Sequence, residues 1–170
     1  MKKKRLNRSK GILFFITGLS GAGKTTFARQ IKSKIKKRYG ETIYLDGDNL
    51  RKIFNLKEYD KKQRFNNVLK YLTLAKFLIN NRVNVILSVI GLSYNIHKII
   101  RKFDNHIIIL IKGDDKLINQ KRKLLIKNIV GKDIKEEFPK NPELEIFNKY
   151  NKNKKILKIK TIFDKIIKII

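Results

Sequence analysis

The chain has 170 residues, of which 42% are hydrophobic, and it contains no cysteine. This length and apolar content predict one folded domain, and the lack of cysteine excludes disulfides, thiolate catalysis and cysteine-ligated metals. The formal net charge of +28 favours anionic ligands, but the lysines are spread along the whole length, so we expect nucleic acid to bind only non-specifically.

Apolar runs and helical periodicities alternate along most of the chain. Four apolar runs predict strands, at residues 11–17, 42–45, 83–88 and 106–111. Apolar residues at helical spacing predict helices at residues 24–39, 60–80, 93–103 and 114–124, with a short helix within 46–54. Strands that alternate with helices through short loops are typical of a three-layer α/β/α fold with a mainly parallel sheet.

Particular residues are expected at the boundaries and on the inner sides of these helices. Gly40 follows the helix at 24–39 and is a natural C-cap. Asp114 is a natural N-cap for the helix at 114–124. The inner side of the helix at 60–80 is expected to carry Leu69, Leu72, Ala75, Lys76 and Ile79.

The two ends of the chain and one internal segment have less regular patterns. Residues 1–10 form a basic tail, and residues 11–170 are expected to form a single domain. Residues 125–142 contain both prolines and no clear period, as expected of a lid that closes over a site. The second half of residues 151–170 predicts a closing amphipathic helix or strand pair that docks on the core. No apolar window is long enough to span a membrane, and the short run at 12–17 leads into a glycine-rich motif, so we expect a cytoplasmic protein.

Residues 18–25 read G-L-S-G-A-G-K-T, which matches the phosphate-binding pattern G-x-x-x-x-G-K-[ST] between a predicted strand and a predicted helix. The glycines permit positive φ angles, and the loop amides together with the helix N-terminus surround phosphate groups. Lys24 is expected on the β- and γ-phosphates of ATP, and the Thr25 hydroxyl on Mg²⁺. The predicted ATP-binding residues are Gly18, Ser20, Gly21, Ala22, Gly23, Lys24, Thr25 and Thr26.

Two other classes of P-loop protein fit the sequence less well. GTPases read guanine with N-K-x-D, and the nearest candidate, residues 148–151, lacks the aspartate. Motor-type ATPases usually carry an acidic residue at the end of a later strand, where the predicted strand 83–88 ends in Ser88. Two further alternatives stay open, namely a nucleic-acid-binding NTPase that uses the basic surface and a catalytically silent regulatory domain.

An acidic turn, L-D-G-D-N-L-R, follows the second predicted strand at residues 45–51. A carboxylate at the carboxyl end of a neighbouring parallel strand points toward the crevice beside the P-loop. Asp46 is expected to help hold Mg²⁺, and either Asp46 or Asp48 to accept the proton of an attacking hydroxyl. Arg51 lies one helical turn further on and could hold an acceptor phosphate. Lys24, Asp46 and Asp48 are therefore the predicted catalytic residues.

The motif GLSGAGKTT followed by LDGDNLR resembles the adenylyl-sulfate kinases, over residues from about Gly11 to Leu144. The resemblance implies transfer of the ATP γ-phosphate to the 3′-hydroxyl of adenosine 5′-phosphosulfate, giving ADP and the 3′-phosphorylated product used in sulfate activation. It also implies a homodimer, and N-P-E-L at 141–144 matches the family after its lid. The acceptor-binding residues that it implies are Asp48, Arg51, Tyr59, Arg64, Asn67 and Ile129, with Tyr59 stacking on the base.

Several positions depart from the family's pattern. Gln63 stands where the family has aspartate, Gly91 where it has serine, and Ile129 where a second phenylalanine stacks on the base. The lid segment R-D-x-K-G-L-Y is replaced by residues 119–125, in which Lys121, Arg122 and Lys123 could still compensate phosphate charge. A smaller pyrimidine base would suit the isoleucine. The alternative acceptor is therefore another small nucleotide, such as cytidine diphosphoramidate.

Overall fold

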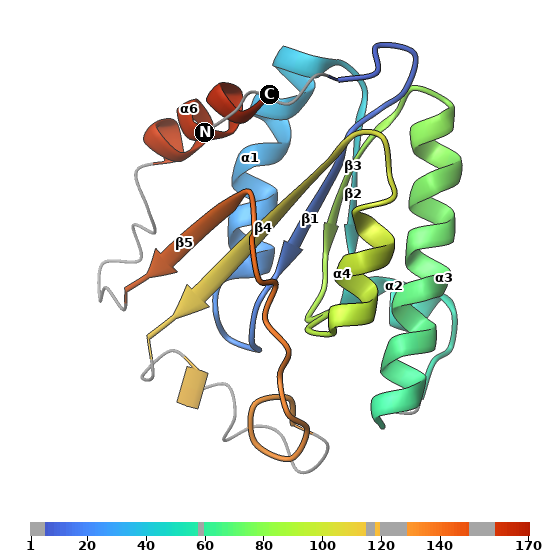
Figure 1. Cartoon of the computed structure of the whole chain (residues 1–170), viewed down its shortest axis with the longest axis vertical. Coiled ribbons are helices and arrows are strands. Elements are labelled where there is room, and N and C mark those ends of the chain that lie inside the picture. The colour runs from blue at the N-terminus through green and yellow to red at the C-terminus, as the bar shows by residue number, and fades with distance from the viewer. Residues whose placement is uncertain (1–5, 58–59, 115–117, 120–128, 150–158) are drawn as a thin grey trace.

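The computed structural model describes residues 6–57, 60–114, 118–119, 129–149 and 159–170 (Figure 1). Its five strands form one sheet in the order β2-β3-β1-β4-β5, and every pairing is parallel. The strands are β1 (Leu13–Thr17), β2 (Thr42–Asp46), β3 (Asn84–Ser88), β4 (His106–Gly113) and β5 (Leu144–Asn148). The helices are α1 (Lys24–Tyr39), α2 (Gly47–Ile53), α3 (Lys61–Asn80), α4 (Tyr94–Ile100) and α6 (Ile159–Ile169).

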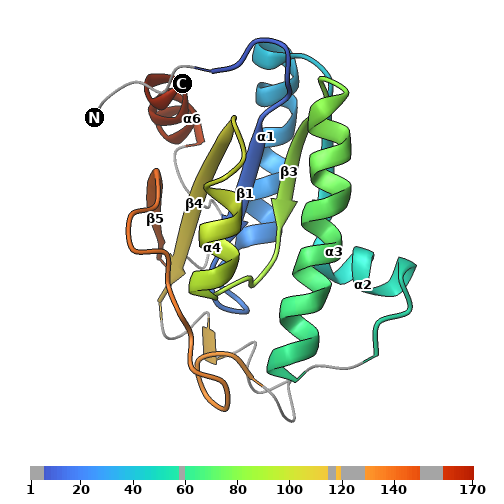
Figure 2. The same cartoon turned by 45° about the vertical axis from the view of Figure 1, so that its right-hand side comes forward.

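Helices cover both faces of the sheet, with α1 and α6 on one side and α3 and α4 on the other (Figures 1 and 2). Every residue of β1 is buried, and successive side chains of this strand enter the two faces in turn. Phe14 and Ile16 pack in the core beneath α1 and α6, whereas Leu13 and Phe15 pack in the core beneath α3 and α4. The parallel sheet with helices on both faces confirms the predicted three-layer α/β/α fold.

Two buried asparagines hold the amino-terminal ends of the strands together. The Asn84 side chain accepts a hydrogen bond from the Ile12 amide at 3.0 Å and donates to the carbonyls of Tyr39 at 2.9 Å and Glu41 at 3.0 Å. Asn105 makes comparable bonds to the segment that precedes β1. These two side chains thus pair backbone groups in the segment before β1, at the end of α1 and in the segment before β2. This pairing matters because buried backbone groups are costly to leave without partners.

The helices α1, α2 and α3 and the strands β1 to β4 lie within a few residues of their predicted bounds. Gly40 has a φ of 91° and ends α1 as predicted, and its amide donates to the Lys36 carbonyl. The helix predicted at 93–103 is shorter, because α4 ends at Ile100 and single turns follow it. Most of the helix predicted at 114–124 lies outside the described residues.

Two expectations about the elements were wrong, and one strand was missed. Lys76 is exposed, and the inner side of α3 instead includes Val68 and Tyr71. β5 was not predicted, because an edge strand with outward-facing Glu145 and Phe147 resembles a polar loop in sequence. β2 is not the neighbour of β1, because β3 lies between them.

The C-terminal segment forms a helix, which decides between the two predicted alternatives. Ile162, Ile166 and Ile169 of α6 are buried in the core that α1 shares. The expectation that this segment docks on the core is therefore confirmed. Within the described residues, no helix is both long enough and apolar enough to cross a bilayer.

Candidate active site

The loop at residues 18–23 connects β1 to α1 at the carboxyl edge of the sheet (Figure 1). Gly18, Gly21 and Gly23 have φ angles of 149°, 84° and 97°. A Cβ atom at Gly18 would lie 2.2 Å from the Ile111 carbonyl oxygen, so β4 approaches too closely for a side chain. The loop therefore needs glycine for its backbone course and for its packing.

Lys24 begins α1, and its ammonium group donates to the carbonyl of Leu19 at 2.8 Å within the same loop. Burial lowers the pKa of Lys24 to about 8, although the charges of Asp48 and Asp46 act in the opposite direction. Both carboxylates act on this lysine, so the three charged groups lie near one another at the carboxyl ends of β1 and β2.

Asp46 ends β2, caps α2 and accepts hydrogen bonds from four donors. Its Oδ1 atom accepts from the amides of Asp48 at 3.1 Å and Asn49 at 3.2 Å. Its Oδ2 atom accepts from the hydroxyls of Tyr44 at 2.6 Å and Thr25 at 3.2 Å. Burial alone would raise the pKa of Asp46, but these hydrogen bonds outweigh it and hold the pKa below its usual value. Asp46 is therefore a fixed anion that joins the P-loop helix to β2.

Tyr44 is a site residue that the sequence analysis missed. Its ring packs against the core beneath α1, and burial together with donation to Asp46 raises its pKa to about 12. The hydroxyl therefore stays protonated and acts as a hydrogen-bond donor. The signal available in the sequence was spacing alone, because residues two apart on a strand face the same side.

Thr25 and Asp46 offer a pair of oxygen donors that fits Mg²⁺. This ion is usually held by one or two carboxylates together with substrate phosphates and water. An ionised carboxylate can only accept hydrogen bonds, so the Thr25 hydroxyl is the donor in its bond to Asp46. The lone pairs of the hydroxyl oxygen then stay available for a cation. Within the described part of the chain, His, Asp and Glu do not gather in groups of three that could hold a metal. A cation here would accordingly be held jointly with phosphates.

Four of the six predicted acceptor residues lie on two helices beside the P-loop and the acidic turn. Asp48 and Arg51 lie on α2, and Arg64 and Asn67 lie on α3, whose first half runs beside α2 (Figure 2). The Asn67 and Ile129 side chains are covered by protein, with 3% and 4% of their surfaces exposed. Tyr59 lies outside the described residues.

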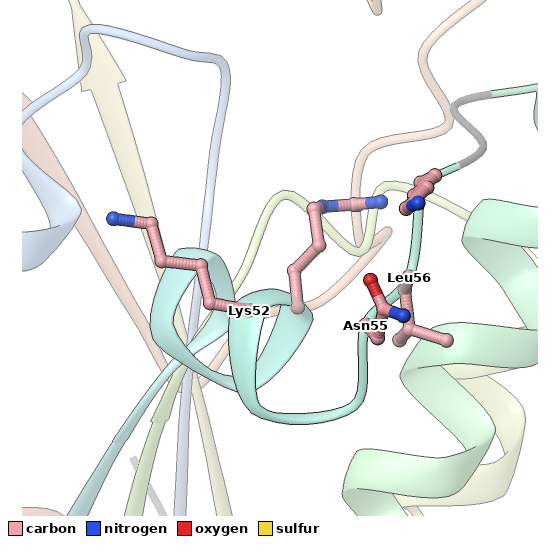
Figure 3. A pocket seen from close by; sticks show the side chains of 5 residues that line it. Lys52, Asn55 and Leu56 are labelled. Atoms are coloured by element: carbon pink, nitrogen blue, oxygen red, sulfur yellow. The ribbon is translucent and has the colours of Figure 1, made fainter.

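A pocket of about 320 Å³ opens at the end of α2. Figure 3 shows Asn55 and Leu56 together on one side of this pocket and Lys52 extending away from them. Three of the residues that line the pocket are cationic. The lining residues are Arg51, Lys52, Asn55, Leu56 and Lys57. Their charge suits a negatively charged group.

A glycine-rich phosphate-binding loop after β1, with one aspartate at the end of β2 and another in the first turn of α2, is typical of a P-loop phosphotransferase. The chain matches the family model described as adenylylsulphate kinase over residues 10–147, and it belongs to that family. It is accordingly a kinase that phosphorylates a hydroxyl group, as its named relatives are.

Two curated relatives differ in the acceptor that their names state. Over 144 residues the chain is 38% identical to a cytidine diphosphoramidate kinase from Campylobacter jejuni, covering 79% of this chain and 83% of the relative. Over 175 residues it is 28% identical to an adenylyl-sulfate kinase from Buchnera aphidicola, covering 94% of this chain and 83% of the relative.

The fold also matches a solved structure of the family. The adenylylsulfate (APS) kinase CysC of Mycobacterium tuberculosis, solved in complex with AMPPNP and APS, superposes with a TM-score of 0.76 at 22% identity. The match covers 92% of this chain and 98% of that one. This likeness supports the fold class.

Proposed function

We propose that this kinase transfers the γ-phosphoryl group of ATP to a hydroxyl of cytidine diphosphoramidate, with adenosine 5′-phosphosulfate as the second candidate acceptor. The observation that carries phosphoryl transfer is the junction of Thr25, in the P-loop helix, with Asp46 of the acidic turn. The higher identity to the cytidine diphosphoramidate kinase favours the first acceptor.

The ATP phosphates would bind to the loop amides of residues 18–26 and to the Lys24 ammonium group. Thr25 and Asp46 would hold Mg²⁺, which neutralises charge on the transferring group. The backbone amides at the start of α1 would stabilise the same charge, because helix N-termini favour anions. Catalysis in this arrangement depends on position and electrostatics rather than on covalent chemistry.

Asp48 is the better candidate for the base that accepts the proton. Asp46 is held by four hydrogen-bond donors and is the carboxylate assigned to Mg²⁺, so a different group is needed to accept the proton. Asp48 is exposed on the first turn of α2. We expect Asp48→Asn to lower kcat by about a hundredfold or more while the affinity for an ATP analogue stays within about twofold. Rapid-quench kinetics with calorimetry would test this, and an unchanged kcat would remove Asp48 from the mechanism.

The acceptor would lie between α2 and α3, with its anionic group at the basic pocket. Arg51 lines that pocket, and Lys52 and Lys57 add charge. Of the other residues that the resemblance implies, Arg64 would hold the acceptor from α3 and Tyr59 would contact its base, whereas Asn67 and Ile129 are covered by protein.

Residues 125–142 would close over the bound substrates and exclude water, which limits wasteful hydrolysis of ATP. The described part of this segment contacts the start of α4 and the P-loop. The Tyr94 amide donates to Glu137 at 2.7 Å, and Val130 packs in a small cluster that also includes Leu19 of the P-loop. Movement of this segment would therefore reach the phosphate-binding loop directly.

Adenosine 5′-phosphosulfate stays the second candidate because the family model and several relatives carry that activity in their names. The sequence alone put this acceptor first. The relative with higher identity reverses the order.

A coupled ADP-release assay with each acceptor, and with none, tests the proposal. We expect kcat/KM to be at least tenfold higher for cytidine diphosphoramidate than for adenosine 5′-phosphosulfate, with little ADP formed in the absence of acceptor. Lys24→Ala should abolish turnover while circular dichroism shows the same fold. A preference for adenosine 5′-phosphosulfate would reverse the assignment, and full turnover by the Lys24 variant would reject the P-loop mechanism.

A further inference from the structure

Asn148 ends β5 and reaches the P-loop from the far end of the chain. Its side-chain amide donates to the Ala22 carbonyl at 3.1 Å, and the side chain is 2% exposed. The Asn148 backbone is fixed as well, because it pairs with Gly113 of β4 and its carbonyl accepts from the Asp114 amide at 3.2 Å. Asn148 is therefore a rigid donor aimed at the loop.

The contact satisfies a carbonyl that the helix does not use. The Phe27 amide donates to the Gly23 carbonyl at 3.0 Å, and α1 begins at Lys24, so the Ala22 carbonyl precedes the helical hydrogen bonds. Ala22 is fully buried, and a buried carbonyl without a partner is costly. Asn148 supplies this partner at the residue where the loop turns into the helix.

The same side chain also limits the next residue. A Cβ atom at Gly23 would lie 2.5 Å from the Asn148 amide nitrogen. Gly23 and Asn148 therefore fit each other closely, and Asn148 occupies the space behind the loop. With the Ala22 carbonyl turned toward Asn148, the amides that follow are free to face the opposite side of the loop.

We infer that Asn148 is a positioning residue for nucleotide binding, because it turns the Ala22 carbonyl away from the phosphates and fixes the Gly23 backbone. This inference rests on the proposed function, since it assumes that the loop binds ATP. It adds a residue outside the glycine-rich motif, on a strand that the sequence did not predict. Asn148 touches neither substrate, so its effect is on the affinity for ATP rather than on the acceptor.

Calorimetry with a non-hydrolysable ATP analogue and Mg²⁺ tests the inference on the full chain. Asn148→Ala should raise the Kd of the analogue about tenfold, the factor expected for one lost hydrogen bond to a buried group. The KM for ATP should rise in parallel while the KM for the acceptor stays within about twofold. Asn148→Asp should weaken binding further, because its carboxylate would face the Ala22 carbonyl and add negative charge beside the phosphates.

Asn105→Ala is the matched control. Asn105 is 1% exposed and also donates to backbone carbonyls, but at the opposite end of the sheet. This variant should lose thermal stability and keep the wild-type Kd at a temperature where all variants are folded. Asn148→Ser replaces the alanine variant if that one does not fold.

Three other results would contradict the positioning role of Asn148 or the proposed function. Wild-type affinity in folded Asn148→Ala would reject the positioning role while leaving the proposed function intact. Equal loss of affinity in Asn105→Ala would show general destabilisation instead. A wild-type protein that does not bind the analogue would reject the proposed function and the inference together.

Discussion

Tyr44 and Asp46 lie two residues apart on β2, and the short bond between them fixes a carboxylate beside the P-loop. Tyr44→Phe removes this bond and keeps the ring in the core. Because partners that orient a metal ligand typically contribute 10–100-fold to metal affinity, we expect the Kd of Mn²⁺ with a bound ATP analogue to rise about tenfold. Electron paramagnetic resonance would measure this affinity without turnover.

Tyr39→Phe is the control for the tyrosine change. Tyr39 also packs against the core beneath α1, but it contacts Phe14 rather than the acidic turn. Removal of the Tyr39 hydroxyl should leave the Mn²⁺ affinity unchanged. Equal Mn²⁺ affinity in the two variants would mean that Tyr44 has only a packing role.

The lysine of the P-loop predicts a pH dependence of nucleotide binding. Burial lowers the pKa of Lys24 to about 8, so in the free protein its ammonium group loses its proton as the pH rises through that value. The neutral amine attracts phosphates less, and affinity for an ATP analogue should fall about tenfold between pH 7 and pH 9. Calorimetry at the two pH values would measure it.

Lys24→Arg distinguishes this explanation from other titrations. A guanidinium group stays charged throughout this range, so the variant should show weaker binding that changes little with pH. A wild-type affinity that is constant to pH 9 would show that the ammonium group keeps its proton.

At the level of elements, we expect the hydrogen bonds of Asn84 to be important for the stability of the fold. This side chain satisfies backbone groups of the segment before β1, the end of α1 and the segment before β2. Asn84→Ala would leave several of them buried without partners, at a cost of about 2–4 kcal/mol in the free energy of unfolding. Urea denaturation would measure the loss, and a change below about 0.5 kcal/mol would contradict it.

Contiguous patterns made most of the fold and part of the site predictable. The P-loop and the acidic turn are short motifs, and buried parallel strands read as apolar runs, so their existence follows from local sequence. Asn148 acts through a contact with a residue distant in the chain, which no local pattern records. Tyr44 was missed because a spacing of two residues on a strand does not by itself indicate a hydrogen bond. β5 was missed for a related reason, since its pairing with β4 rather than its composition makes it a strand.

At the scale of the whole molecule, the charge of +28 predicts weak binding of any polyanion. Such binding depends on released counterions, so homopolymeric RNA should bind at low salt and dissociate at physiological salt. We expect no increase in ADP release when RNA is added without acceptor. Fluorescence anisotropy and the ADP assay would test this, and strong stimulation by RNA would favour a nucleic-acid-dependent NTPase.

The contact between Ala22 and Asn148 joins residues 126 positions apart. Bringing such distant segments together is slow, so parallel sheets tend to complete their pairing late. In a refolding chain the helices can return first, while the loop acquires its final course when the outermost strand arrives. Capture of a fluorescent nucleotide should therefore lag behind the recovery of helicity and mark the last step of maturation.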